Sequence, residues 1–149
     1  LAAGSRRQYA PFLPASSENL GTGRIAPELP SDQIIQVPVR TLDSLANEHN
    51  LTHVDFIKID VEGYEKEVLL GSHNIIRTST PAIMIELQDK SSLTWLAAFL
   101  AEFNYNSPIP LPGASNNYLI TTQTPDLQNL TSYLAQLAPI LPSILSKHH

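Results

Sequence analysis

Two runs of apolar residues, each closed by acidic residues, constrain the fold of this chain more than any other feature. The first is VDFIKIDVEGYE, residues 54–65, where the mostly apolar segment from Val54 to Ile59 leads directly into Asp60. A strand that is apolar at nearly every position is typical of a parallel strand buried on both faces. The stretch therefore predicts a buried strand over residues 54–59 with carboxylates at its end.

The second run is PAIMIEL, residues 81–87, which predicts another buried strand and again ends in a carboxylate, Glu86. A helix is expected between the two runs, over residues 64–70, with Val68 and Leu69 facing the core and Gly71 at the C′ position. A further helix is expected to begin at Ser91 or Ser92. Five residues at helical spacing form its apolar face: Leu93, Leu96, Phe99, Leu100 and Phe103.

The segments before and after these runs are richer in turn residues. A short strand is expected within residues 6–14, where Pro11 and Pro14 would confine it to a sheet edge or a loop. Residues 34–39 have strand composition interrupted by Pro38. A short helix follows, with Thr41 as its N-cap, Asp43 in its first turn, and an apolar face of Leu42, Leu45 and Ala46.

The order of these elements predicts an α/β fold, because buried strands that alternate with helices form parallel sheets. The last two strand candidates, residues 104–111 and 116–123, are joined by turn residues and are expected to pair antiparallel. A length of 149 residues fits one ordinary domain. We expect the α/β domain to cover residues 1–124, and residues 125–149 to form a leucine-rich helical tail that Pro139 and Pro142 break or kink.

Composition excludes several classes of function. The chain has 9 basic and 14 acidic residues and a net charge of −5, with no basic cluster beyond Arg6-Arg7, so no nucleic-acid partner is expected. It has no cysteine, which excludes disulfides and thiolate metal sites. No apolar run is long enough for a membrane span and no signal-peptide pattern is present, and we expect a cytoplasmic protein. Because the first residue is Leu1, we interpret the sequence as starting inside a longer one.

The acidic residues that follow the two strands are the candidate functional residues: Asp60, Glu62 and Glu86, with Glu65 close by. Open α/β sheets bind ligands beyond the carboxyl ends of their strands, where these side chains would meet. One could act as a general base, the group could hold a divalent cation, or the carboxylates could bind a polar ligand. If they are close together, some have raised pKa values or a cation compensates them. Glu62 and Glu65 could instead only stabilise a helix start, which is our interpretation of Glu65.

Lys58 interrupts the first apolar strand. It could extend to the sheet edge, or it could pair with one of the carboxylates, and we favour the pairing because an unpaired buried ammonium is costly.

The segment VPVRTLDSLANEHNLTHVDFIKIDVEGYEKEVLLGS, which begins at Val37, and the later PAIMIEL resemble the FkbM family of methyltransferases. The resemblance runs from Val37 to Leu87, extends more weakly to about Thr122, and includes the first residues loosely. It implies a partial Rossmann-like class I sheet of parallel strands, closed by an antiparallel strand pair and flanked by helices. It also implies S-adenosylmethionine as cofactor and O-methylation of a sugar, glycolipid or natural product.

The family's glycine-rich cofactor loop and its ribose-binding acidic residue do not occur in this sequence. The pair Gly21 and Gly23 in NLGTGR reads as a turn. The chain therefore resembles the C-terminal part of the domain, cofactor-binding residues are not assigned, and S-adenosylmethionine is expected to bind weakly or not at all.

The resemblance implies that Asp60 lies near the hydroxyl of a small-molecule or glycan acceptor, as a base or an orienting group, and that Glu62 and Glu86 shape the acceptor pocket. No metal is assigned. The alternative is a non-catalytic remnant or interaction domain of the same fold. In that case, an exposed strand edge or the C-terminal helix would support self-association.

Overall fold

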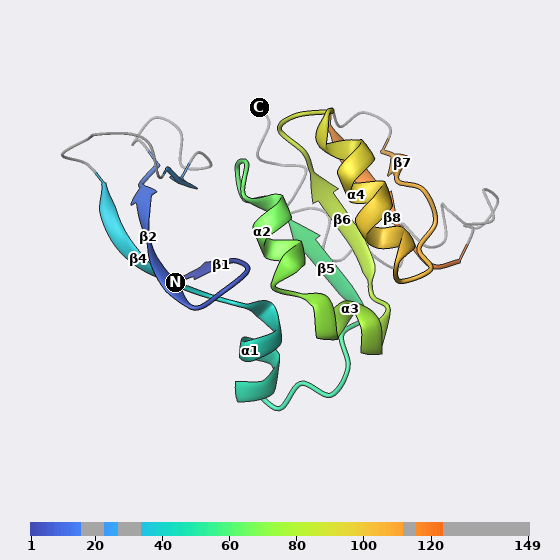
Figure 1. Ribbon diagram of the computed structural model, residues 1–149, viewed down its shortest axis with the longest axis horizontal. Coiled ribbons are helices and arrows are strands. Elements are labelled where there is room, and N and C mark those ends of the chain that lie inside the picture. Colours follow the sequence, from blue (N-terminus) through green and yellow to red (C-terminus); the bar gives the residue numbers. More distant parts are fainter. Residues whose placement is uncertain (16–22, 27–33, 112–115, 124–149) are drawn as a thin grey trace.

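The computed structural model describes residues 1–15, 23–26, 34–111 and 116–123, and their strands form two four-stranded sheets (Figure 1). The N-terminal sheet has the strand order β1-β4-β2-β3, with β1 Ala2–Ala3, β2 Gln8–Leu13, β3 Arg24–Ile25 and β4 Ile35–Arg40. Apart from β1, which pairs parallel with β4, its strands pair antiparallel. The sequence analysis predicted an α/β fold, which is confirmed, but it did not predict this second sheet.

The other sheet has the order β5-β6-β8-β7, with β5 Phe56–Ile59, β6 Ala82–Glu86, β7 Ile109–Pro110 and β8 Asn117–Ile120. Strands β5 and β6 are parallel, as two strands joined by a helical crossover should be. Strand β8 runs antiparallel to both β6 and β7 and lies between them. The predicted antiparallel pair of final strands is therefore confirmed.

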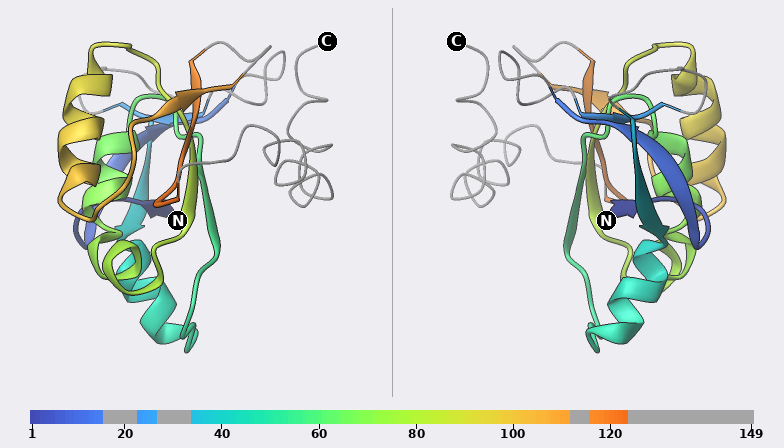
Figure 2. Two further views of the ribbon diagram at one scale, coloured as in Figure 1. Left: turned by 90° about the vertical axis from the view of Figure 1, so that its right-hand side faces the viewer. Right: turned by 90° about the vertical axis from the view of Figure 1, so that its left-hand side faces the viewer.

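Helices α2 (Glu65–Leu70), α3 (His73–Ser79) and α4 (Ser92–Ala101) lie on one side of the β5-β6-β8-β7 sheet (Figures 1 and 2). Every second residue of the strands points towards these helices, and these side chains form the main core together with the helices. The fully buried members include Ile59, Leu69, Ile76, Ile83, Ile85, Leu96, Leu100 and Ile120. The core positions predicted for the helices are confirmed: Val68 and Leu69 in α2, and Leu96, Phe99 and Leu100 in α4. Among the described residues, no helix has the length and apolar character needed to cross a bilayer.

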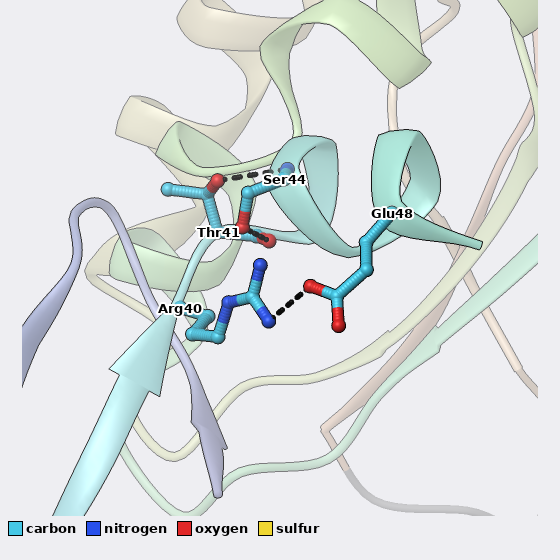
Figure 3. Close-up of polar contacts among 4 residues, drawn as sticks. All are labelled: Arg40, Thr41, Ser44 and Glu48. Carbon is cyan, nitrogen blue, oxygen red and sulfur yellow. Dashed lines mark hydrogen bonds and ion pairs between the residues drawn. The ribbon is translucent and has the colours of Figure 1, made fainter. Parts of the chain in front are cut away.

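Helix α1 (Leu42–Glu48) begins as the sequence predicts, and Figure 3 shows its first turn. The Thr41 hydroxyl accepts a hydrogen bond from the Ser44 backbone N–H at 3.0 Å, and the Ser44 hydroxyl donates to the Thr41 carbonyl at 2.8 Å. Arg40 forms an ion pair with Glu48 at the other end of the helix. The N-cap predicted at Thr41 is therefore confirmed.

Strand β5 differs from the expectation that both of its faces are buried. Ile57 and Ile59 are buried against the helices, whereas Lys58 on the opposite face is exposed and Phe56 is half-buried. The reason is its position, because β5 forms an edge of the described sheet, whereas β6, which is buried from Ala82 to Ile85, has a neighbour on each side.

The prolines of the N-terminal sheet also differ from expectation, because β4 continues through Pro38 and β2 is not an edge strand. Gly4 donates its N–H to the Arg40 carbonyl, so the backbone of Arg40 faces β1. Backbone groups alternate in direction, so Pro38 faces the same way, and β1 pairs with β4 only from Val39 onwards. The N–H that proline lacks is not needed there.

Gly71 directly follows α2, so the helix ends where the sequence predicts, but its φ of −83° is not the left-handed conformation that glycine often adopts there. A glycine is required by space instead, since a Cβ at this position would lie 2.0 Å from the carbonyl oxygen of Gly4. The Gly71 carbonyl also accepts a hydrogen bond from the Asp43 N–H at 3.0 Å. Gly71 is therefore one of the points where the N-terminal segment and the helix layer come into contact.

Helix α3 was not predicted, and its start is stabilised by a distant residue. The carboxylate of Asp43 accepts the backbone N–H groups of Asn74 and Ile75 at 2.9 and 3.0 Å. Asp43 lies in the first turn of α1, as predicted, and it caps α3 as well. The predicted leucine-rich tail and the domain boundary at residue 124 lie outside the described residues.

Candidate functional site

Asp60 and Glu86 lie at the carboxyl ends of β5 and β6, on the same side of the sheet where both parallel strands end. The register pairs Ile59 with Ile85, so Asp60 and Glu86 are the next residues of two neighbouring parallel strands. Neighbouring strands lie about 4.8 Å apart. The predicted juxtaposition of these two residues is thus built by the register of the sheet.

Asp60 is paired with the lysine of its own strand. The Lys58 ammonium lies 2.6 Å from Oδ2 of Asp60, and the Asp60 side chain is 39% exposed. The pairing predicted for Lys58 is confirmed. The ammonium holds one carboxylate oxygen of Asp60, and no hydrogen bond or ion pair to the other oxygen comes from the residues that the structure describes.

The turn that follows Asp60 has two residues in the left-handed region, Glu62 with φ 54° and Gly63 with φ 95°. The Gly63 N–H donates to Oε1 of Glu65 at 2.8 Å, and Glu65 is only 8% exposed. Gln88, which follows β6, donates from its side-chain amide to the Glu62 carboxylate. The turns after the two parallel strands are therefore held to each other. Sequence reasoning missed Gln88, because nothing in the local pattern indicates contact across 26 residues.

Each acidic residue of the β5–α2 turn has a separate partner: Asp60 has Lys58, Glu62 has Gln88, and Glu65 has the Gly63 N–H. The predicted crowding of four carboxylates at one point does not occur. Within residues 1–15, 23–26, 34–111 and 116–123, no three histidine or carboxylate side chains are grouped so that they could hold one metal ion.

The next turn, between β6 and α4, is fixed by Asp89. Its carboxylate accepts hydrogen bonds from the backbone N–H of Ser91 and from the Ser91 hydroxyl. These bonds hold the pKa of Asp89 below its ordinary value. Ser91 is the N-cap of α4 by position, as predicted, but the side chain that accepts backbone N–H at this turn belongs to Asp89.

A surface cavity of about 320 Å³ lies between α3 and the end of α4, at the opposite edge of the sheet from Asp60. It is lined by His73, Arg77, Thr80, Glu102, Phe103 and Asn104. Thr80 precedes β6, whereas Glu86 ends it. None of the predicted site residues lines this cavity, and the strand ends that carry Asp60 and Glu86 stay the candidate site.

A comparison with protein families decides which family the sequence represents. The methyltransferase FkbM domain matches residues 1–107. The chain belongs to the FkbM methyltransferase family. The resemblance predicted from the segment that begins at Val37 is thereby confirmed, and the match reaches further towards the N-terminus than that segment. Searches of curated proteins and of solved structures found no match.

Methyltransferases of this family imply S-adenosylmethionine, and the described residues can be tested for a fit to it. Free backbone N–H groups in a turn can bind an anionic group such as a carboxylate. The turn after β5 has one glycine, Gly63, and its N–H is already bound by Glu65. The turn after β6 is closed by Asp89 on the Ser91 N–H. Neither of these two N–H groups is free for the cofactor, and we assign no described residue to its binding.

Proposed function

We propose that this chain forms the acceptor-binding part of an S-adenosylmethionine-dependent methyltransferase that methylates a hydroxyl group of a sugar, glycolipid or natural product. Membership of the FkbM methyltransferase family supports the reaction class. The observation that supports the site is the position of Asp60, immediately beyond the carboxyl end of a parallel strand and beside Glu86. Ligands of open α/β sheets bind at that edge.

In this proposal Asp60 acts as the general base. Its second carboxylate oxygen takes the proton of the acceptor hydroxyl, so that the O–H bond of the acceptor breaks as an O–H bond to Asp60 forms. Lys58, at 2.6 Å, holds the Asp60 carboxylate in position. Glu62 and Glu86 line the acceptor side. Methyl transfer requires alignment of the reacting atoms, which the fixed turn after β5 supports.

Asp60→Asn in the longest natural form of the protein tests this role, with methyl transfer from labelled S-adenosylmethionine as the readout. We expect turnover to fall by about 100-fold or more, which is the usual contribution of a general base. Asp55→Asn is the matched control, because Asp55 precedes the same strand and its side chain, which is 92% exposed, pairs only with His53 among the described residues. Equal turnover for Asp60→Asn and the natural protein would remove Asp60 from the mechanism.

The cofactor requires its own measurement, calorimetric titration of S-adenosylmethionine into the 149-residue chain. We expect weak or absent binding, because the glycine-rich cofactor loop of the family does not occur in this sequence. Micromolar affinity would contradict this expectation and would show that the chain holds the cofactor by itself. Absent binding together with absent turnover in the longest natural form would favour the alternative, a non-catalytic interaction domain of the same fold.

A further inference from the structure

Asn117 lies directly opposite Glu86 in the ladder between β6 and β8. Because β8 is antiparallel to β6, the first residue of β8 lies at the edge where β6 ends. Asp60, Glu86 and Asn117 therefore lie at the same end of three neighbouring strands, with Asp60 directly after the last residue of β5. A rule that looks only at the ends of strands overlooks Asn117, because it stands at the start of one.

The hydrogen-bond pattern brings the side chains of Glu86 and Asn117 close together. Leu87 donates its N–H to the Asn116 carbonyl at 2.9 Å, so these two residues form the hydrogen-bonded pair of the ladder. The next pair, Glu86 and Asn117, is then of the non-hydrogen-bonded type. In such pairs the side chains lie on one face with their Cβ atoms about 5 Å apart.

The alternation along each strand shows which face these side chains share. Ile83, Ile85 and Ile120 belong to the core under the helices, whereas Met84 and Leu119, which pair with each other, do not. Glu86 is two residues from Met84, and Asn117 is two residues from Leu119. Both therefore lie on the face opposite the helices. Lys58 pairs with Met84 in the register and lies on the same face. Asp60, two residues after Lys58, therefore also belongs to this face.

The side chains of Asn117 and Glu86 differ in whether their polar groups have a partner. Asn117 is 8% exposed and has an interaction of its own. The half-buried carboxylate of Glu86 has no hydrogen-bond or ion-pair partner among the residues that the structure describes. Burial of a carboxylate is costly unless a donor reaches it. A bound ligand with a hydroxyl group would supply that donor.

We propose that Asn117 is a specificity-determining residue of this site, and that with Glu86 it binds a neutral, hydroxyl-bearing group of the acceptor next to Asp60. This inference rests on the proposed function. Carboxylates at Asp60 and Glu86 repel an anionic group, whereas the amide of Asn117 both donates and accepts, as neighbouring hydroxyl groups require. The family match ends at residue 107, so Asn117 lies in the part of the chain where the family model sets no residue.

Binding to the intact chain tests this role without the cofactor and without turnover. Saturation-transfer NMR with methyl α-D-glucopyranoside as the neutral probe and glucose 6-phosphate as the anionic probe measures recognition directly. Asn117→Ala and Glu86→Gln are the test variants. Asn47→Ala is the matched control, because Asn47 is exposed on α1 in another part of the chain. Glu86→Gln also preserves size at a half-buried position, which covers the case in which Asn117→Ala fails to fold.

We expect the natural chain and Asn47→Ala to bind the neutral probe, and each test variant to lose about tenfold in affinity, as the loss of a hydrogen bond to a charged or buried group does. The double variant should lose less than the product of the single losses, because both side chains hold the same group. Unchanged affinity in both variants, preference for the anionic probe, or no binding by the natural chain would overturn the proposal. Probe binding without methyl transfer in the longest natural form would instead contradict the proposed function alone.

Discussion

At the level of single residues, the sequence predicts local interactions and misses those that depend on distant ones. Thr41 caps the helix that follows it, and that signal lies within three residues. Lys58 pairs with Asp60 two residues away, which was also predicted. Gly71 ends its helix as predicted, but the reason that it must be glycine was missed, because the backbone that excludes a side chain there belongs to Gly4, 67 positions earlier in the numbering.

Gly71→Ala tests the explanation by space. The new Cβ would lie 2.0 Å from the Gly4 carbonyl oxygen and 3.3 Å from the Cα of Thr41, so backbone on both sides must move. We expect the free energy of unfolding to fall by at least about 2 kcal/mol, as overpacking of a rigid contact does. Chemical denaturation followed by circular dichroism measures it.

Gly63→Ala provides the comparison for Gly71. A Cβ at Gly63 has open space, with Gln88 Oε1 at 3.8 Å as its nearest neighbour, but φ is 95°. The cost there is backbone strain of about 1–2 kcal/mol. A Gly71→Ala variant as stable as the natural chain would show that the Gly4 contact is not close in solution.

At the level of elements, strands and helices with continuous or periodic apolar patterns were predicted, and short elements supported by other parts of the chain were not. Strand β6 and helix α4 satisfy the pattern throughout. Helix α3 has seven residues, and its cap comes from Asp43, 31 positions earlier. The N-terminal sheet was missed because β1 and β3 have two residues each, too few for a periodic signal.

Asp43→Ala tests the capping of α3 from a distance. The variant leaves the N–H groups of Asn74 and Ile75 without their acceptor, and it also removes a favourable charge from the first turn of α1. We expect a loss of about 1–2 kcal/mol in unfolding free energy. Asp55→Ala is the control, because this exposed aspartate should change stability by less than about 0.5 kcal/mol. If the two variants are equally stable, Asp43 does not cap α3.

At the level of the whole molecule, the candidate site and the junction between the sheets depend on the same helix. Tyr64 precedes α2, and its ring lies 3.0 Å from where a Cβ on Gly4 would be. Glu67 of α2 accepts a hydrogen bond from Ser5, while Glu65 at its start holds the turn after Asp60. The N-terminal sheet therefore supports the helix that shapes the candidate site. Sequence alone could place Asp60 at a strand end, but it could not show this support.

The unpaired edge of β5 is the place where we expect any self-association of the molecule. Among the described residues β5 has a partner on one side only, and an unpaired edge can accept a strand from another chain. Its centre carries the exposed Lys58, and a charged side chain on an edge strand opposes such pairing.

Lys58→Val should therefore raise the fraction of dimer in sedimentation equilibrium, since it gives the edge the uninterrupted apolar sequence from Phe56 to Ile59. Lys90→Val, in an exposed turn away from this edge, controls for the loss of a positive charge. Equal dimer fractions in the two variants would show that the β5 edge takes no part in self-association, and any dimer would then form elsewhere on the molecule.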